Sequence, residues 1–206
     1  LSLTLDWRPF VPPMMHTLST PGSGSVLAKG HYNTMGRATV TGEFEGRRIE
    51  LWGDGFMDHS WGPRTGIPLG TRWLVASFGP DFCIMILQNM TEQGSMVKAS
   101  YILRDGRVVN ASSRTRIHMT VGDDSYSPEG CEAEVWDVEG RCYRVRGKVV
   151  APCSVYPFHD SFLTHGTAVF ECGGRVGRAI LECSNNFKGP PDWEVATLGL
   201  AGQTPI

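Results

Sequence analysis

The chain has 206 residues, of which 41% are hydrophobic and 19% are charged, and its formal net charge is -2. This length suits one domain with a sizeable core. The balanced charge, without any basic block, gives no electrostatic reason to expect nucleic acid, and no apolar run approaches the roughly 20 residues that span a bilayer. We therefore expect neither a nucleic-acid partner nor a membrane span.

The first 24 residues are predicted to hold one strand and a linker. Leu1–Asp6 alternates apolar and polar side chains as a half-buried strand does, and three prolines between positions 9 and 13 then interrupt regular structure. The stretch Ser19–Ser25 consists of turn-forming residues and predicts a loop. We place a domain boundary in this loop and expect a β domain over residues 25–185, followed by a C-terminal tail over residues 186–206.

Most of the chain between positions 37 and 183 has the pattern of β-strands, and no segment keeps an apolar stripe at helical spacing. Short turns that contain glycine, such as Glu45-Gly46 and Asp105-Gly106, favour tight antiparallel hairpins because glycine tolerates positive φ. We therefore predict an all-β fold, an antiparallel meander that closes into a barrel or nearly so. The predicted strands are Arg37–Phe44, Arg48–Trp52, Arg72–Phe78, Phe82–Gln88, Met96–Leu103, Glu132–Val138, Tyr143–Val150, Thr167–Cys172 and Val176–Cys183.

The positions of the six cysteines argue against disulfides. If the two nearby turns have two residues each, Cys142 faces Asp137 and Cys172 faces Arg175, so neither cysteine meets another across its hairpin. Most of the cysteines lie in apolar, strand-like segments without Cys-x-x-Cys spacing, which is typical of free buried thiols. Free thiols favour a reducing compartment, and we expect a cytoplasmic protein.

The densest polar chemistry lies in the segment Gly53–Arg64, with the sequence Gly-Asp-Gly-Phe-Met-Asp-His-Ser-Trp-Gly-Pro-Arg. Side chains of a strand alternate between faces, so Asp58 and Ser60 are expected on one face and His59 with Trp61 on the other. A histidine and an indole on one face suit an apolar cavity with one group that titrates near neutral pH. The alternative is a buried hydrogen-bond cluster, in which Asp58 accepts backbone N–H groups and the closing arginine pairs with a carboxylate.

This segment resembles the Asp-His-Asn/Ser-Trp-Gly signature of the lipocalin-like superfamily of hydroxyneurosporene synthase (carotenoid 1,2-hydratase) and AttH-like proteins. The approach to the signature, Gly36–Gly42 followed by Ile49–Gly53, fits the same pattern. The resemblance covers Gly36–Arg64 well and Thr167–Glu182 loosely, and between these ranges only the strand pattern matches.

The resemblance implies a calycin-type β fold, often built as two lipocalin-like halves in tandem, with a cofactor-free site for hydrophobic polyenes, terpenoids or polyketides. Relatives include hydratases and cyclase or pericyclase enzymes of natural-product pathways. By this resemblance His59 and Trp61 line the site and Asp58 is the acid of the motif. Asp58 or His59 would handle a proton, and Arg64 would orient a carboxylate or carbonyl group. Trp61 and Trp73 would stack against the substrate or stabilise cationic character.

Two departures from the resembled pattern matter. The hydratases carry a further Tyr-x-Asp on a downstream strand, whereas the comparable stretch here, Cys83–Gln88, holds no carboxylate. This departure weakens the expectation of alkene hydration. In addition, 206 residues are fewer than two full barrels need, so the resemblance implies a second lipocalin-like half or a homodimer as a partner.

Two residues outside the motif are further candidates for substrate binding. Trp73 begins the strand after the motif and is expected either in the core or beside Trp61 in the cavity. Glu182 lies in an apolar strand, where a carboxylate needs a partner such as Arg64 or must be protonated.

A second polar cluster contains His159, Asp160 and His165. Its spacing matches neither a pair of histidines on one helix face nor a zinc ribbon. We expect these residues in a loop and at the start of a strand, and we expect no metal site.

These observations predict a cofactor-independent enzyme of the isomerase, cyclase or hydro-lyase type. It would cyclise, isomerise or hydrate a hydrophobic terpenoid, polyene or polyketide with acid or base help in an apolar cavity. One alternative is a non-catalytic carrier that uses the same cavity. Another is a structural half of a two-domain protein.

Overall fold

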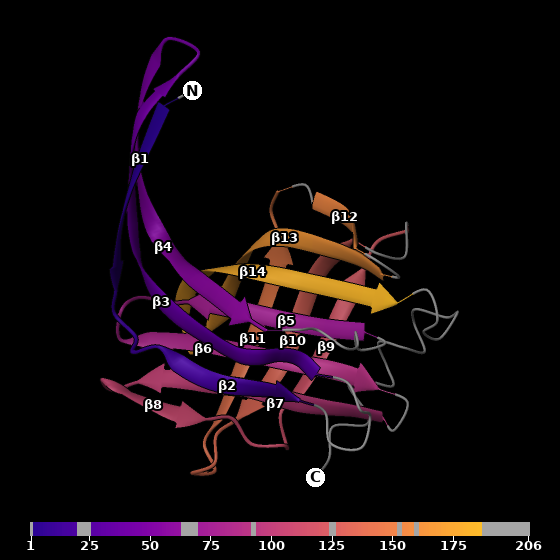
Figure 1. Ribbon diagram of the computed structural model, residues 1–206. Coiled ribbons are helices and arrows are strands. Elements are labelled where there is room, and N and C mark those ends of the chain that lie inside the picture. The colour runs from indigo at the N-terminus through magenta and orange to yellow at the C-terminus, as the bar shows by residue number, and fades with distance from the viewer. Residues whose placement is uncertain are drawn as a thin grey trace.

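A computed structural model describes residues 2–19, 26–62, 70–91, 94–123, 127–151, 154–158 and 161–186 of the chain. Every regular element in these ranges is a β-strand, and paired strands run antiparallel. The strands form a sheet of four and a sheet of ten (Figure 1). The predicted all-β antiparallel fold is therefore confirmed. No helix in the described ranges could cross a membrane.

The four-stranded sheet is built around one long hairpin. Its two strands, β3 and β4, pair along the whole of β4, from Phe44 opposite Arg47 to Gly30 opposite Trp61. Glu45 and Gly46 connect them with φ angles of 50° and 73°, and two consecutive positive φ angles give the tight turn that fits twisted strands. On the free edge of β3, β2 pairs with the first part and β1 with the last part. The strands are β1 (Ser2–Pro9), β2 (Met14–Ser19), β3 (Val26–Phe44) and β4 (Arg47–Trp61).

The ten-stranded sheet has the order β8-β7-β6-β5-β14-β13-β11-β10-β9, and β12 pairs with β13 beside this path. It curls back on itself, so that β9, β10 and β11 lie behind β5, β6 and β14 (Figure 1). The result is a curled antiparallel half-barrel. Its strands are β5 (Gly70–Ser77), β6 (Phe82–Thr91), β7 (Gly94–Arg104), β8 (Arg107–Asn110), β9 (Arg116–Val121), β10 (Pro128–Trp136), β11 (Cys142–Val149), β12 (Ser154–Phe158), β13 (Ser161–Cys172) and β14 (Arg175–Asn186).

The central strands of this sheet are apolar on both faces. In β5, Leu74 and Ala76 point into the half-barrel, whereas Val75 points to the opposite side, and all three are buried. The inner cluster packs β5, β6 and β7 against β9, β10 and β13, with Phe170 as its largest fully buried side chain. The second cluster lies on the other side of β5 to β7, outside the half-barrel, and packs this side against Met35 of β3 and the segment before β2. Nearly continuous apolar runs are what strands covered on both faces require.

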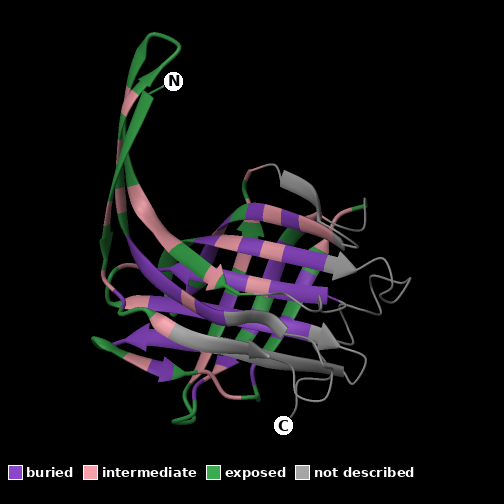
Figure 2. Ribbon diagram, in the orientation of Figure 1, coloured by how far each residue is buried: buried purple, intermediate pink, exposed green. Residues whose placement is uncertain are grey.

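Beyond the body, β1 and the distal parts of β3 and β4 project as a narrow, three-stranded ribbon (Figures 1 and 2). We call residues 2–9, 36–44 and 47–55 the ribbon. Most of its residues are exposed, in contrast to the buried strands of the body. Because β1 and β2 both pair with β3, the residues before the predicted domain boundary belong to the same sheet as those after it. The predicted division of the chain into three parts stays a prediction.

The two ends of the larger sheet meet near the end of β10. Val138 N donates to Asn110 O at 3.1 Å, and Ser112 N donates to Trp136 O at 2.6 Å. The Asp137 carboxylate anchors this junction. Its Oδ1 accepts the backbone N–H groups of Glu139 and Arg141 at 2.9 and 2.8 Å. Its Oδ2 lies 3.2 Å from the Tyr143 hydroxyl and 3.3 Å from the Arg104 guanidinium.

The same carboxylate changes the register that we predicted for the neighbouring hairpin. Cys142 was expected opposite Asp137, but it lies opposite Trp136. The two hydrogen bonds to Asp137 Oδ1 close a longer turn, so a two-residue turn does not form. Cys172 lies opposite Arg175, as predicted.

The cysteines behave as predicted where they are described. Five are free, and four of these, Cys83, Cys131, Cys172 and Cys183, are buried; Cys153 lies outside the described residues. Burial raises the pKa of the Cys83 and Cys131 thiols to about 12 and that of Cys172 to about 11. These three thiols are protonated at neutral pH and are not activated as nucleophiles.

Removal of the Asp137 carboxylate tests the junction. Burial alone would raise the pKa of Asp137, but the N–H of Arg141, the Tyr143 hydroxyl and the Arg104 guanidinium together hold it below its usual value. Asp137→Asn should lower the free energy of unfolding by about 2–4 kcal/mol at pH 7, because buried donors lose a charged acceptor. Urea denaturation measures the change. The difference from the parent should persist above about pH 4 and shrink as the pH falls through the lowered pKa.

The matched control is Glu134→Gln, which removes an exposed carboxylate from the same hairpin. Its partner Arg144 is also exposed, so the loss should stay within about 0.5 kcal/mol. Equal effects of the two substitutions would contradict the anchoring role of Asp137.

Candidate functional site

The pairing of β3 with β4 sets the position of every residue in the motif. Asp58 lies opposite Asn33, His59 opposite Tyr32, and Ser60 opposite His31. Directly opposed residues share a face, so the expected alternation of Asp58 with His59 is realised. The inner face, which carries Asp58, looks toward the larger sheet, because Phe56 on the same face contacts Trp73 of β5.

Two side chains of β3 hold Asp58. Asn33 Nδ2 donates to Asp58 Oδ1 at 2.7 Å, and His31 Nε2 lies 2.9 Å from the same oxygen. His31 Nε2 also lies 2.9 Å from Asn33 Oδ1. Because both neighbours of this nitrogen are acceptors, we assign it a proton that the two oxygens share. His31 and Asn33 are buried, whereas the side chain of Asp58 is 37% exposed. The carboxylate therefore connects a buried imidazole to accessible space.

Aromatic and charged side chains lie beside this group on the larger sheet. The rings of Phe56 and Trp73 meet edge to face, with centroids 5.1 Å apart. Trp73 is opposite Glu182 of β14, and Glu182 is opposite His165 of β13, so the three side chains form a row on one face. His165 Nε2 lies 2.6 Å from Glu182 Oε2.

The positions of the two carboxylates follow from strand geometry. Asp58 lies one same-face repeat, about 7 Å, along β4 from Phe56, and Glu182 lies one strand spacing, about 5 Å, from Trp73. Both acids therefore flank the aromatic contact. We call Asp58, His31, Asn33, Phe56, Trp73, Glu182 and His165 the interlayer group.

Glu182 and His165 form a charged pair when the imidazole is protonated. The hydrogen bond to Glu182 raises the pKa of His165 above its ordinary value, although partial burial acts in the opposite direction. The side chain of His165 is half-exposed and that of Glu182 is mostly buried. The partner of Glu182 in the structure is thus His165. Arg64, the partner expected from the sequence, lies outside the described residues.

His59 and Trp61 lie on the outer face of the same strand and form an aromatic cluster with Tyr32. Their ring centroids are 5.5 Å apart, and that of Tyr32 lies 5.3 Å from His59 and 6.3 Å from Trp61. The Trp61 indole covers Gly30, where a Cβ atom would overlap it. His59 and Trp61 are exposed. Their part in substrate binding stays a prediction, on the face opposite to Asp58.

The other acid of the motif has a structural role. Asp54 Oδ1 accepts two hydrogen bonds from the Arg37 guanidinium, and Asp54 Oδ2 accepts one from Ser77 Oγ at 2.9 Å. This contact joins β4 to β5 and, together with Phe56 and Trp73, fixes how the hairpin crosses the larger sheet.

Sequence reasoning missed His31, Asn33 and Tyr32, which complete both sides of the motif. The alternation in Gly30-His31-Tyr32-Asn33 was the available signal, since His31 and Asn33 fall on one face of a strand. His165 was expected at the start of a strand without a functional role. His159 and Asp160 lie outside the described residues.

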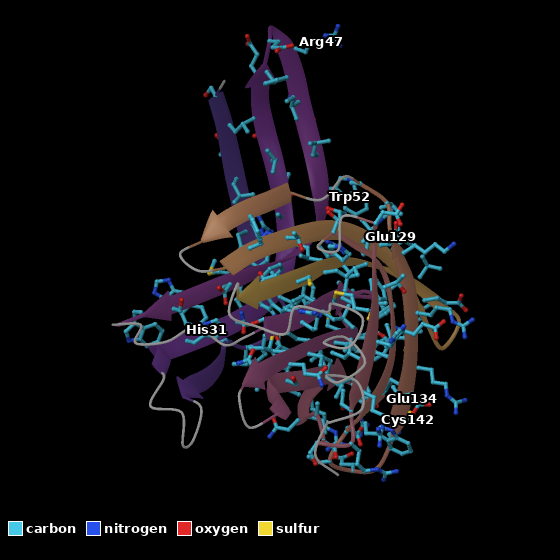
Figure 3. All side chains as sticks on the ribbon, turned by 90° about the vertical axis from the view of Figure 1, so that its right-hand side faces the viewer. His31, Arg47, Trp52, Glu129, Glu134 and Cys142 are labelled. Carbon is cyan, nitrogen blue, oxygen red and sulfur yellow. The ribbon has the colours of Figure 1, made fainter. Side chains whose placement is uncertain are left out.

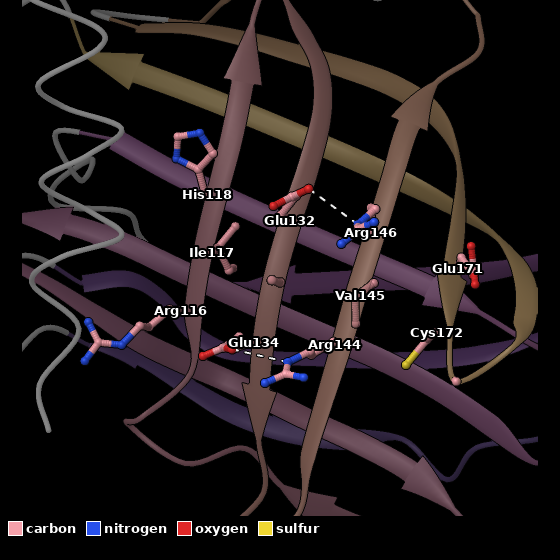
Figure 4. A pocket seen from close by; sticks show the side chains of 12 residues that line it. Arg116, Ile117, His118, Glu132, Glu134, Arg144, Val145, Arg146, Glu171 and Cys172 are labelled. Carbon is pink, nitrogen blue, oxygen red and sulfur yellow. Dashed lines mark hydrogen bonds and ion pairs between the residues drawn. The ribbon is translucent and has the colours of Figure 1, made fainter.

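Two open depressions lie away from the motif, on the side of β9, β10, β11 and β13 shown in Figure 4. Their volumes are about 670 and 820 Å³. Side chains of alternating charge cross the first one in register: Glu132 pairs with Arg146, and Glu134 with Arg144, each at 3.4 Å. Such a lattice of exposed, mutually paired charges suits a solvated sheet face and not a hydrophobic ligand. Among the described residues, no cluster could hold a metal ion.

The chain matches the model of one protein family. Residues 1–187 match the family described as "Domain of unknown function (DUF7064)". The chain belongs to the DUF7064 family. No curated protein matches this DUF7064 chain. Among solved structures it is similar to kievitone hydratase from Nectria haematococca, with 8% identity and a TM-score of 0.47. The match covers 87% of this chain and 59% of the hydratase chain, and a likeness this distant does not assign a function.

The Glu182–His165 pair of this DUF7064 domain can be tested by titration. Glu182→Gln should return the pKa of His165 toward about 6.5, because the substitution removes the acceptor that favours the imidazolium form. NMR titration of the His165 ring measures the shift. The pair adds stability that is complete below about pH 6.5 and is lost as the pH rises through the raised pKa. The stability difference between parent and variant should therefore be smaller at pH 9 than at pH 6.

The control is Glu171→Gln, which removes an exposed carboxylate from β13. It should leave the His165 titration unchanged. An unaltered His165 curve in Glu182→Gln would show that the pair does not control this histidine.

Proposed function

We propose that the chain is a cofactor-independent enzyme that acts on a hydrophobic terpenoid, polyene or polyketide, and that Asp58 handles a proton between the two sheets. The observation that carries this proposal is the Asp58–His31–Asn33 group beside the Phe56–Trp73 contact. It combines a partly accessible carboxylate, a buried imidazole and aromatic neighbours. The similarity of the motif to that of the lipocalin-like hydratases supports the same substrate class.

The geometry suits a proton transfer through Asp58. The hydrogen bond from Asn33 and the contact with His31 both involve Oδ1, so we assign the second oxygen, Oδ2, to the substrate. Transfer of a proton from Asp58 to a carbon–carbon double bond would give a carbocation, and the His31 N–H would stabilise the carboxylate that remains. The cation would then return a proton to the Asp58 carboxylate and give an isomer. Alternatively, a second double bond would attack it and leave a ring-bearing cation, or water would add and leave an oxonium ion. Each of these would also lose a proton to Asp58, which restores the acid.

Aromatic rings and a second acid would complete the site. Phe56 and Trp73 would shield the cation and stabilise it through their faces. Glu182, fixed by His165, would bind a polar group of the substrate at the far side of these rings. Arg64 is proposed to orient a carboxylate or carbonyl. Trp61 and His59 would contribute only if the substrate binds the outer face.

Substitutions of two neighbouring residues test the two faces of β4 separately. Asp58→Asn keeps the shape of the side chain and removes the acid, and it should lower kcat by about 10²–10⁴-fold if Asp58 is the proton donor. His59→Ala changes the outer face of the same strand and should alter kcat by less than about threefold. The parent and both variants are incubated with a panel of terpenoids, polyenes and polyketides, and isomeric, cyclised or hydrated products are scored by mass spectrometry.

Binding of the same compounds, followed by tryptophan fluorescence, distinguishes the competing functions. Asp58→Asn should bind substrate with an affinity close to that of the parent. Loss of activity in His59→Ala but not in Asp58→Asn would move the reaction to the outer face. Compounds that bind but are never converted by the parent would show that the protein is a carrier.

A further inference from the structure

The ribbon has one face made of apolar side chains. Leu5, Val40 and Leu51 lie opposite one another on its three strands. One repeat toward the tip, Leu3 and Ile49 flank Gly42, and one repeat toward the body, Trp7 lies beside Ala38. Because no register shift occurs between β1, β3 and β4, these side chains share a face over the whole ribbon.

The opposite face of the ribbon carries charged and polar side chains together with one aromatic residue, Trp52, which is 75% exposed. Glu43 pairs across the strands with Arg48, Thr41 with Glu50, and Arg37 with Asp54. Arg37 and Asp54 form a 3.0 Å ion pair. Alternation of this kind, with one apolar and one charged face, is the pattern of a sheet that covers something on one side.

The apolar face continues along the hairpin onto the body of the protein. Met57 and Trp61 occupy the same face of β4, together with the exposed His59. We call the continuous surface from Leu3 to Trp61 on this side the outer face. Its most exposed apolar residues are Leu5 at 62%, Leu51 at 60%, Leu3 at 50%, Trp61 at 41% and Met57 at 38%.

Glycines make the outer face shallow at its centre. Gly36 and Gly55 lie under the Trp7 indole: a Cβ atom at Gly36 would come within 2.8 Å of the ring, and one at Gly55 within 3.4 Å. No atom lies within 4 Å of the corresponding point at Gly53, beside Ala38. The Gly-Asp-Gly of the motif therefore shapes this surface, and a shallow sheet face can pack against another sheet about 10 Å away.

The exposed apolar area of the outer face is large for one side of a single chain. From their exposed fractions, the five side chains expose on the order of 500 Å², near the top of the range for the largest patch on a monomer. Two such faces would bury about 1,000 Å² from these side chains alone, with Trp7, Val40 and Ile49 adding to it. This total reaches the size that a specific interface needs.

We propose that the outer face binds the outer face of a second copy of this chain, in a two-fold dimer. In such a dimer the same patch meets itself, so a surface that is apolar along its length opposes no like charges, and two-fold dimers are the commonest soluble assemblies. A lipid surface fits less well, because the ribbon has no basic excess. Its four arginines, Arg8, Arg37, Arg47 and Arg48, are matched by four acids, Asp6, Glu43, Glu50 and Asp54. Figure 3 shows Arg47 at the tip of the ribbon, away from the body.

The dimer also accounts for the outer half of the motif. His59 and Trp61 would lie at its interface, where an aromatic side chain contributes most when it is desolvated. The inner face with Asp58 would stay outside the interface. The dimer thus does not depend on the proposed reaction.

Adjacent residues on opposite faces of β4 give a matched pair for the test. Leu51→Glu places a carboxylate in the centre of the outer face, once from each copy, whereas Trp52→Glu makes a comparable change on the polar face, where Trp52 is 75% exposed. Sedimentation velocity of the chain over a range of concentrations should show a dimer for the parent and for Trp52→Glu. Leu51→Glu should raise the dissociation constant by at least about a hundredfold, because buried charges remain unpaired.

Circular dichroism and thermal unfolding establish that both variants fold. Leu5→Ala is a milder change on the same face, and we expect it to weaken dimerisation less than Leu51→Glu does. A parent that stays monomeric at the highest concentration would overturn the proposal. So would equal association of Leu51→Glu and the parent. Cosedimentation with phosphatidylcholine vesicles tests the lipid alternative. If the parent binds vesicles but forms no dimer in solution, and Leu51→Glu abolishes the binding, the outer face binds lipid and the dimer proposal is overturned.

Discussion

The fold depends on the burial of β5, β6 and β7 from both sides. Leu74, Ile84 and Ile102 fill the half-barrel, while Val75, Met85 and Tyr101 on the same strands need a cover on the other side. Exposed on one side, such strands would leave a large apolar surface in water. The β3–β4 hairpin supplies the cover. The protein therefore consists of three layers, and the position of the hairpin across β5 is the consequence of apolar burial, made specific by the bonds of Asp54 and the contact of Phe56 with Trp73.

One strand then serves two environments. Because β4 crosses the larger sheet with one face inward, Asp58 meets the buried His31 and Asn33, whereas its neighbour His59 stacks with Tyr32 and Trp61 on the outside. Successive side chains of this polar segment therefore lie in two different environments. The proposed reaction uses the inner half and the proposed dimer uses the outer half, so the two can coexist in one molecule. Gly53 and Gly55 of the segment belong to the outer half, where the absence of a side chain at Gly55 leaves room for the Trp7 indole.

The role of each charged group in this protein depends on how far it is buried and on its hydrogen-bond partners. Exposed pairs such as Glu132 with Arg146 follow the cross-strand pattern of a solvated sheet and contribute little individually. Asp137 differs because it is buried and accepts several hydrogen bonds, which makes it a structural anchor at the junction of the sheet ends. Asp58 and Glu182 are intermediate: each has a defined partner but keeps access to its surroundings. This combination is what a group that exchanges protons or binds a polar atom requires.

The sequence by itself determined most of the strands and the alternation within them, but β2, β8, β9 and β12 were not predicted. All nine predicted strands occur, several of them longer than expected, and the positive-φ glycines mark the hairpin turns. These features are local, since periodicity and turn chemistry act over a few residues. Only the tertiary structure decided which face of β4 is inward, that Asp58 meets His31, and that His165 is the partner of Glu182. Each of these contacts joins strands whose register is set by burial over the whole sheet, and a strand pattern read alone is equally compatible with either face.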